Sequence, residues 1–158
     1  MISFGIHALA KPRVVHIPYS FETGGMEHVI ATVINGTCAS FEHVVVCLTV
    51  SGESSLLLPE SVPVVELRKP SGNSMRFLLQ LARRIQDLQP AVVQTYNWSG
   101  MDGIIAARLA GCSVVHSEHG WDIVDPYGLS IKRILIRRVL SPWVAHYTCV
   151  SRQMERCL

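Results

Sequence analysis

Charged residues are scarce in this 158-residue sequence, at 16% of the composition, and neither sign of charge predominates strongly. The formal net charge is +2 and the isoelectric point is near 8.4. Nucleic-acid-binding proteins usually carry a concentrated basic face and a higher isoelectric point. The composition therefore argues against a nucleic-acid partner.

No hydrophobic run approaches the roughly 20 residues of a membrane-spanning helix, although 49% of the residues are hydrophobic. The opening stretch, MISFGIHALAKPR, lacks the cationic start and the cleavage site of a secretion signal. The five cysteines are an odd number and widely spaced, which favours reduced thiols over a disulfide framework. We therefore expect a soluble, cytoplasmic chain with one hydrophobic core.

What the sequence does contain is an alternation of short β-branched runs with amphipathic stretches. This order is typical of βαβ units, in which helices cover both faces of a parallel sheet. We predict the α/β class, with a doubly wound, mainly parallel sheet in one domain over residues 1–158. The expected strands are 13–18, 42–50, 62–68, 91–95, 113–117 and 143–150.

Cap residues locate two of the expected helices. Asn73 or Ser74 is the expected N-cap of the helix that precedes the fourth strand. Ser99 is the expected N-cap of the next helix, since serine hydroxyls accept hydrogen bonds from first-turn N–H groups. Gly111 is expected to end that helix in the left-handed conformation.

The segment SIKRILIRRVL, residues 130–140, is predicted to be a helix with a mixed surface. On a helical wheel, one side carries Lys132, Arg133 and Arg137 together with two aliphatic residues, and we expect this side to be exposed. The opposite side, which we expect to be buried, carries Ile131, Ile134, Leu135 and Val139. Cations among exposed aliphatic side chains can rest on anionic lipid, so the three cations are candidate membrane-surface residues. A solvated helix face and a surface for another domain are the alternatives.

Ligands of open parallel sheets bind beyond the carboxyl ends of the strands, and three loops at this edge have unusual sequences. Gly24 and Gly25 precede a helix, where exposed backbone N–H groups and the helix dipole favour a phosphate. Such a glycine pair is more often a simple tight turn. The other two loops are 96–100, which is YNWSG, and 118–122, which is EHGWD.

His119 is the strongest candidate for chemistry in these loops. It lies at the expected end of the fifth strand beside Glu118 and Asp122. An imidazole titrates near neutral pH, so it can donate to a sugar hydroxyl or a phosphate, or transfer a proton. Strand alternation places His116 and Glu118 opposite Ser117 and His119, so these side chains do not converge as metal ligands do. We expect no metal, and we interpret His116 as a core residue.

The sequence also argues against a dinucleotide-binding site. Such a site needs G-x-G-x-x-G after the first strand and an acidic residue at the end of the second. Here YSFETGGMEH follows the first strand, and the second ends in LTVS. We therefore expect neither NAD nor another tightly bound cofactor.

The three loops in this order resemble the N-terminal domain of family 4 glycosyltransferases, which are retaining enzymes with the GT-B fold. The resemblance covers nearly the whole chain, from VVHIPYSFETGGMEHVIATVIN through PAVVQTYNWSGMDGIIAARLAG and VVHSEHGWDIVDPYG to YTCVSRQMERCL. The EHGWD segment, followed by a basic helix and a strand ending in VSR, is most similar to sugar transferases of exosortase-associated exopolysaccharide systems. This resemblance implies sugar transfer from a nucleotide-sugar donor to a glycan or a lipid-linked acceptor at the inner face of the cytoplasmic membrane.

The resemblance also implies roles for particular residues. Gly24 and Gly25 would face the diphosphate of the donor, and His119 would contact the transferred sugar near the reaction centre. The acceptor side of the cleft would be lined by Tyr96, Asn97, Glu118 and Asp122.

The enzymes of this family also have a second Rossmann-like domain, which binds the nucleotide and carries two glutamates in an E-x7-E arrangement. These 158 residues do not contain that C-terminal domain, so we expect them to lack transferase activity by themselves. Two other interpretations remain open. One is a non-catalytic Rossmann-like binding module or truncated remnant that associates with a partner. The other is an unrelated α/β protein that binds a nucleotide or a metal.

Overall fold

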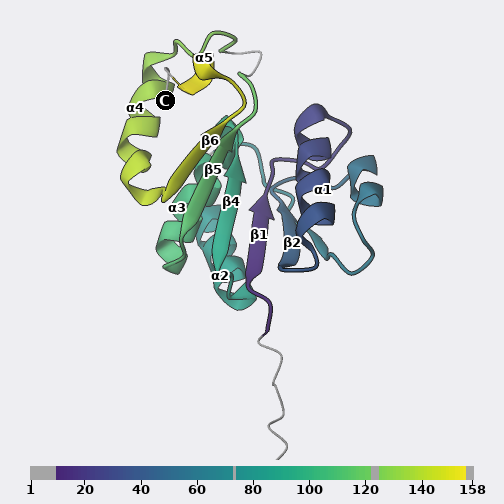
Figure 1. The fold of residues 1–158 in the computed structure, drawn as a ribbon. Coiled ribbons are helices and arrows are strands. Elements are labelled where there is room, and N and C mark those ends of the chain that lie inside the picture. The colour runs from purple at the N-terminus through teal and green to yellow at the C-terminus, as the bar shows by residue number, and fades with distance from the viewer. Residues whose placement is uncertain (1–9, 73, 122–124, 156–158) are drawn as a thin grey trace, which may run out of the picture.

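The computed structural model describes residues 10–72, 74–121 and 125–155, and in this part of the chain a six-stranded parallel sheet forms the centre (Figure 1). The strand order is β3-β2-β1-β4-β5-β6. This order confirms the predicted α/β class and the doubly wound arrangement. The strands are β1 (Arg13–Ile17), β2 (Glu42–Cys47), β3 (Val64–Glu66), β4 (Val92–Tyr96), β5 (Val114–Glu118) and β6 (His146–Cys149).

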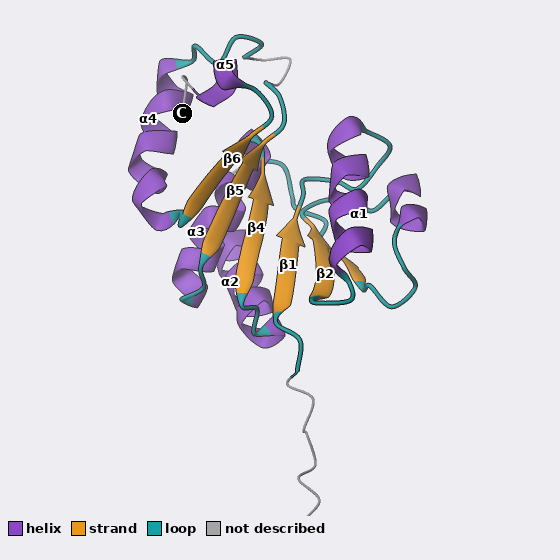
Figure 2. Ribbon diagram, viewed as in Figure 1, coloured by secondary structure: helices purple, strands orange, loops and turns teal. Residues whose placement is uncertain are grey.

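Helices cover both faces of this sheet (Figure 2). Helix α1 (Gly25–Thr37) packs over β1 and β2 on one face. The opposite face carries α2 (Met75–Leu88), α3 (Met101–Ala110) and α4 (Ile131–Leu140), while the short α5 (Arg152–Glu155) follows β6. Among the helices described, none is long and apolar enough to cross a bilayer.

The period-two alternation of the strands divides the core between the two faces. In β2, Val44 and Val46 face the larger cluster with α2, α3 and α4, whereas Val45 and Cys47 face the smaller cluster under α1. Both faces of the central strands are thus buried, which explains the nearly continuous apolar runs in the sequence. Three strands are several residues shorter than predicted: β2 ends at Cys47, β3 spans only Val64–Glu66, and residues 141–143 form a 3₁₀ turn before β6.

Two of the predicted helix caps are confirmed. The Ser74 hydroxyl accepts a hydrogen bond from the N–H of Phe77 at 3.3 Å, so it caps α2, and Asn73 lies outside the described residues. Gly111 follows α3 in the left-handed conformation, with φ of 75°, and its N–H is bonded to carbonyls of the last turn. A residue with a Cβ would be strained at this φ, which explains the glycine.

The predicted cap of α3 was wrong. Ser99 lies inside a 3₁₀ turn, Trp98–Gly100, and α3 begins one residue later without a side-chain cap. This turn brings α3 close to β4, because Gly103 on the helix faces Thr95 on the strand. A Cβ at Gly103 would come within 2.7 Å of Thr95 Cγ2. The first turn of α3 therefore packs closely on β4 at Gly103 and has no side-chain cap.

The predicted orientation of α4 was also wrong. Arg137 and Leu140 are buried, and Ile136 packs against the core. The side that was expected to be buried is largely exposed, since Ile131 is 74% and Val139 is 67% accessible. The helical wheel placed the cations outside, but a buried carboxylate on β5 draws Arg137 inward, as described below.

The close contact of α3 with β4 predicts opposite effects of two glycine-to-alanine substitutions. Gly103→Ala should lower the free energy of unfolding by about 1–3 kcal/mol, because the new methyl group overpacks against Thr95. The control is Gly36→Ala on the exposed side of α1, where a Cβ meets nothing within 4 Å. It should raise the same free energy by about 0.5–1 kcal/mol through helix propensity. Urea unfolding measures both, and equal effects would contradict this account.

Candidate functional site

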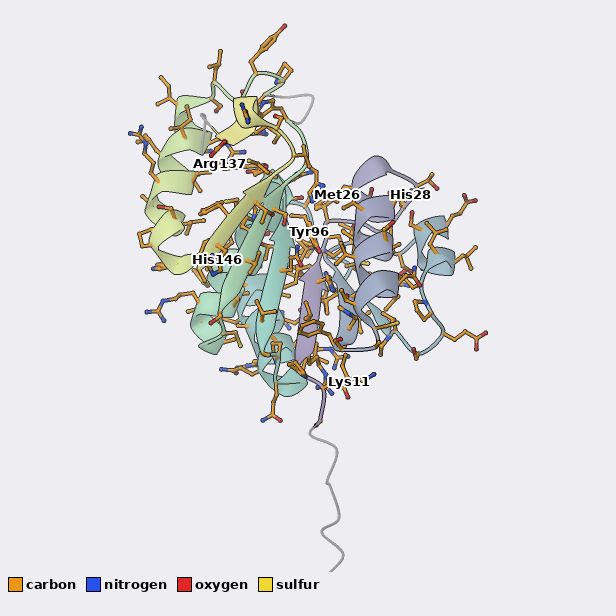
Figure 3. The ribbon with its side chains drawn as sticks, viewed as in Figure 1. Lys11, Met26, His28, Tyr96, Arg137 and His146 are labelled. Atoms are coloured by element: carbon orange, nitrogen blue, oxygen red, sulfur yellow. The ribbon has the colours of Figure 1, made fainter. Side chains whose placement is uncertain are left out.

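A cavity of about 410 Å³ opens at the carboxyl ends of the strands, between the start of α1 and the inner side of α4. In Figure 3, Met26 of α1, Tyr96 of β4 and Arg137 of α4 all lie toward this end of the sheet. The order of the strands reverses between β1 and β4, and doubly wound folds bind ligands at such a switch point. The lining residues are Gly25, Met26, Val29, Asn97, Trp98, His119, Gly120, Trp121, Arg133, Arg137 and Val150.

Asn97 connects three of the segments that form the cavity. Its φ is 51°, a left-handed conformation that asparagine tolerates better than most residues. Its side-chain oxygen accepts the backbone N–H of His119 at 2.7 Å, and its Nδ2 lies 3.4 Å from the sulfur of Met26. The β4 loop therefore holds both the β5 loop and the first turn of α1. Asn97 lines the cavity, and its expected role on the acceptor side stays a prediction.

His119 lies at the wall of this cavity, half-buried, directly after the last residue of β5. Its ring packs against that of Tyr96, with 5.8 Å between the ring centroids. Burial lowers the pKa of His119 below its ordinary value, and the nearby Glu118 opposes this effect only in part. The imidazole is thus mainly uncharged at neutral pH, so it can offer one donor and one acceptor nitrogen to a ligand.

Tyr96 does not offer its hydroxyl to the cavity. The residue is 2% accessible, and its Oη lies 2.6 Å from Nδ1 of His16, deep under α1. Burial raises the pKa of this phenol, so the hydroxyl stays protonated. The sequence placed Tyr96 on the acceptor side of a cleft, whereas the structure gives it a contact with the His119 ring from below.

Glu118 is likewise not open to a ligand, because it is fully buried and paired with Arg137. The Nε of Arg137 donates to Oε1 of Glu118 at 3.0 Å, and Nε2 of His116 lies 3.4 Å from the same oxygen. The guanidinium also lies 5.4 Å from the Trp98 ring centroid and 5.2 Å from that of Trp121. Neither the predicted sugar contact of Glu118 nor the predicted surface position of Arg137 agrees with this arrangement.

The other candidate membrane residues divide between two environments. Arg133 lines the cavity, with its guanidinium 4.8 Å from the Trp98 ring centroid. Lys132 is exposed on the outer side of α4, as expected. The helical wheel correctly grouped Arg133 and Arg137, which are one helical turn apart. It was wrong in expecting their side of the helix to be exposed, because both arginines face the cavity.

The two glycines at the start of α1 differ in access. Gly25 lines the cavity, and a Cβ there would meet nothing within 4 Å. Gly24 precedes the helix in an extended conformation, and a Cβ on it would collide with the carboxylate of Glu27. Gly25 and Met26 in the first turn of α1 thus line the cavity, while Glu27 covers Gly24. Asp122 lies outside the described residues.

Sequence reasoning missed several parts of the cavity wall, namely Met26, Val29, Trp98, Trp121, Arg133 and Val150 in this role. One signal was present: Glu118 ends an otherwise buried strand, and a buried carboxylate requires a cation. The wall combines imidazole, guanidinium and backbone N–H donors with two indole faces, a set suited to a polyol that carries an anionic group.

Among the described residues, no three His, Cys, Asp or Glu side chains form a group that could hold a metal ion.

The fold is that of a Rossmann-like domain, with a cavity at the topological switch point. Residues 23–158 match the model of Glycosyltransferase Family 4, so the chain belongs to this family. A search of curated proteins finds no match.

Solved structures of similar fold include proteins that handle nucleotide sugars. Anabaena HepE in complex with UDP-glucose has a TM-score of 0.67 at 17% identity, over 92% of this chain and 39% of HepE. A UDP-N-acetylglucosamine 2-epimerase has a TM-score of 0.61 at 14% identity, over 92% and 44% of the two chains. S. aureus MnaA with UDP has a TM-score of 0.59 at 16% identity, over 92% and 40%. The chain thus spans about two-fifths of the length of these proteins.

The buried pair of Glu118 and Arg137 predicts a large effect from removing one partner. Arg137→Met should lower the free energy of unfolding by about 3–5 kcal/mol, because it leaves a carboxylate buried without its cation. The double variant Glu118→Gln, Arg137→Met should lose less than Arg137→Met, because no charge is then left alone.

The matched control is Arg138→Met on the exposed side of α4, which should change stability by no more than about 0.5 kcal/mol. Urea unfolding followed by circular dichroism measures all three variants. Equal losses for Arg137→Met and Arg138→Met would show that the ion pair does not hold α4.

Proposed function

We propose that this chain is the acceptor-side half of a retaining glycosyltransferase, which transfers a sugar from a nucleotide-sugar donor to a glycan or a lipid-linked acceptor. The observation that carries the proposal is the cavity at the switch point, where the first turn of α1, His119 and two arginines face one space. Membership of family 4 supports the class of reaction. A role in exopolysaccharide synthesis is the finer part of the proposal, and it is supported by the EHGWD segment and the basic helix that follows.

The donor phosphates would approach the first turn of α1 at Gly25. Backbone N–H groups there have no partner within the helix, and the positive end of the helix dipole favours an anion. The missing side chain of Gly25 leaves room for close approach. UDP and UDP-glucose in the complexes of MnaA and HepE support a nucleotide sugar as the donor.

His119 would hold a hydroxyl of the transferred sugar. Its main chain is fixed by Asn97 and its ring by Tyr96, so little freedom is lost when a sugar binds. An uncharged imidazole can donate one hydrogen bond without adding a charge near the reacting carbon. Asp122 and Asn97 would contribute to the acceptor side, and no metal is required in this proposal.

Catalysis would also need the nucleotide-binding half that family 4 enzymes carry, with its pair of glutamates. We propose that residues 1–158 bind ligands in the cavity but do not turn over a nucleotide sugar by themselves. Sustained turnover of any nucleotide sugar by the purified chain would refute this part of the proposal. The alternative of a non-catalytic binding module predicts the same fold, but no response of the α1 end to nucleotide sugars.

The outer side of α4 supports peripheral contact with the inner face of the cytoplasmic membrane. Ile131, Leu135 and Val139 recur one turn apart and are all exposed, with Lys132 and Arg138 beside them. The sequence of α4 contains no acidic residue. An apolar stripe flanked by cations suits a surface of anionic lipid. The outer side of α4 is thus the candidate membrane surface in place of the side predicted from the helical wheel. Contact of this side with lipid would place the cavity near the bilayer, where a lipid-linked acceptor would lie.

Binding of a donor can be tested on the isotopically labelled chain. UDP-glucose at millimolar concentration should shift the backbone amides of Gly25 and His119, and that of Gly24 less. Gly25→Asp should abolish these shifts, because a carboxylate at the start of α1 repels phosphate while it remains favourable to the helix dipole. The control Ser61→Asp adds the same charge near the amino ends of the strands and should leave the shifts unchanged. An intact fold that gives no shift would favour the binding-module alternative.

Contact of α4 with lipid can be tested by co-sedimentation with vesicles rich in phosphatidylglycerol. The double variant Leu135→Ser, Val139→Ser should weaken binding by about tenfold or more, since apolar burial is lost from two side chains. The control Leu79→Ser alters an exposed leucine of α2, a helix that also carries arginines, and should bind normally. Equal binding of all three proteins would exclude lipid as the occupant of this face.

A further inference from the structure

A chain of four hydrogen bonds runs under α1 from the cavity wall toward the end of that helix. It begins at Oη of Tyr96, which lies 2.6 Å from Nδ1 of His16. Nε2 of His16 lies 3.0 Å from Nδ1 of His43, and Nε2 of His43 lies 3.0 Å from Oγ1 of Thr37. The Thr37 hydroxyl in turn lies 2.5 Å from the carbonyl oxygen of Val33. The chain thus links β4, β1, β2 and α1.

The last bond determines the direction of all the others. A carbonyl oxygen can only accept, so the Thr37 hydroxyl donates its one proton to Val33. Thr37 Oγ1 must then accept from His43, which places the proton of His43 on Nε2. An uncharged His43 accepts at Nδ1, so His16 also carries its proton on Nε2. Nδ1 of His16 is left to accept the hydroxyl proton of Tyr96.

Both imidazoles are uncharged in this arrangement, and their surroundings favour that form. His16 is fully buried, and burial together with the neighbouring His43 lowers its pKa to about 3. Burial also lowers the pKa of His43. A proton added to Nδ1 of His43 would remove the acceptor for His16 and force the chain to reverse. The Tyr96 hydroxyl would then lose its acceptor in a site that water does not reach.

The cavity end of this chain contacts His119. The Tyr96 hydroxyl is held by His16, and the Tyr96 ring packs against the His119 ring, with 5.8 Å between centroids and 49° between the ring planes. Asn97, the next residue, holds the backbone N–H of His119. The imidazole of His119 therefore has one support for its main chain and one for its ring, and both come from the end of β4.

We propose that His16 is a positioning residue for His119: by accepting the hydroxyl proton of Tyr96 it fixes the ring that orients the His119 imidazole in the cavity. The functional meaning of this inference rests on the proposed sugar-binding role of His119. Its structural part stands by itself, since every link is a contact within the chain. His16 touches no ligand in this account and acts only through Tyr96.

The experiment uses nitrogen-15 NMR of the histidine side chains in the free protein. At neutral pH, His16 and His43 should both show a protonated Nε2 and an unprotonated Nδ1. Tyr96→Phe deletes one oxygen, so it should fold, and it should loosen the ring against His119. Water then reaches the imidazole more easily, and the pKa of His119 should rise by about 0.5 unit. His16→Leu should produce the same rise.

A conservative variant of His16 distinguishes a loss of His119 orientation from a general loss of protein stability. His16→Asn supplies an amide oxygen close to the place of Nδ1, so it should keep the Tyr96 bond and leave the pKa of His119 near that of the unaltered protein. His146→Asn, at an exposed histidine of β6, is the matched control. The other titratable or charged neighbours of His119, namely Glu118, His116, Arg133 and Arg137, are unchanged in every variant.

A protonated Nδ1 on His16, or a His119 pKa that is the same in all four variants, would overturn the inference. These readings need no ligand. A failure of the proposed function would appear separately, as an absence of amide shifts when UDP-glucose is added to the unaltered chain.

Discussion

The buried ion pair between Glu118 and Arg137 is the interaction on which the rest of the site depends. A carboxylate at the end of an interior strand is costly to bury in its charged form unless a cation lies beside it. Arg137 supplies it from α4, and its guanidinium also lies against the rings of Trp98 and Trp121. One side chain therefore joins α4 to the ends of β4 and β5, and this junction forms one wall of the cavity.

The same pair determines what the outer surface of α4 displays. Because Arg137 must face inward, Arg133 one turn earlier faces the cavity as well, and the aliphatic residues on the opposite side are left in solvent. The exposed stripe of Ile131, Leu135 and Val139 is thus a consequence of burying Glu118. A helix usually turns its apolar side to the core because burial of apolar side chains lowers the free energy. In α4, pairing Arg137 with the buried carboxylate of Glu118 outweighs the burial of Ile131, Leu135 and Val139.

The sequence was sufficient for the class of fold, the strands and the position of His119, because those follow from periodicity and from the rule for parallel sheets. Its failures concern pairs of residues distant in the chain. Ser99 is a good cap by local chemistry, but it lies in a 3₁₀ turn and does not cap α3, and the close contact of Gly103 with Thr95 could not be read from local sequence. The predicted buried and exposed sides of α4 were exchanged for a similar reason. Nothing near residue 137 in the sequence shows that Glu118 is its partner.

Different interactions stabilise the two walls of the cavity, which meet at His119. On the α4 side a buried charge pair fixes the indoles, whereas on the α1 side an uncharged chain of histidines fixes Tyr96. Burial supports both, because it strengthens a matched ion pair and disfavours protonation of an isolated imidazole. His119 lies between them, and burial lowers its own pKa, so its imidazole is mainly uncharged at neutral pH. The positive character of the cavity wall then comes from the arginines and from the positive end of the α1 dipole.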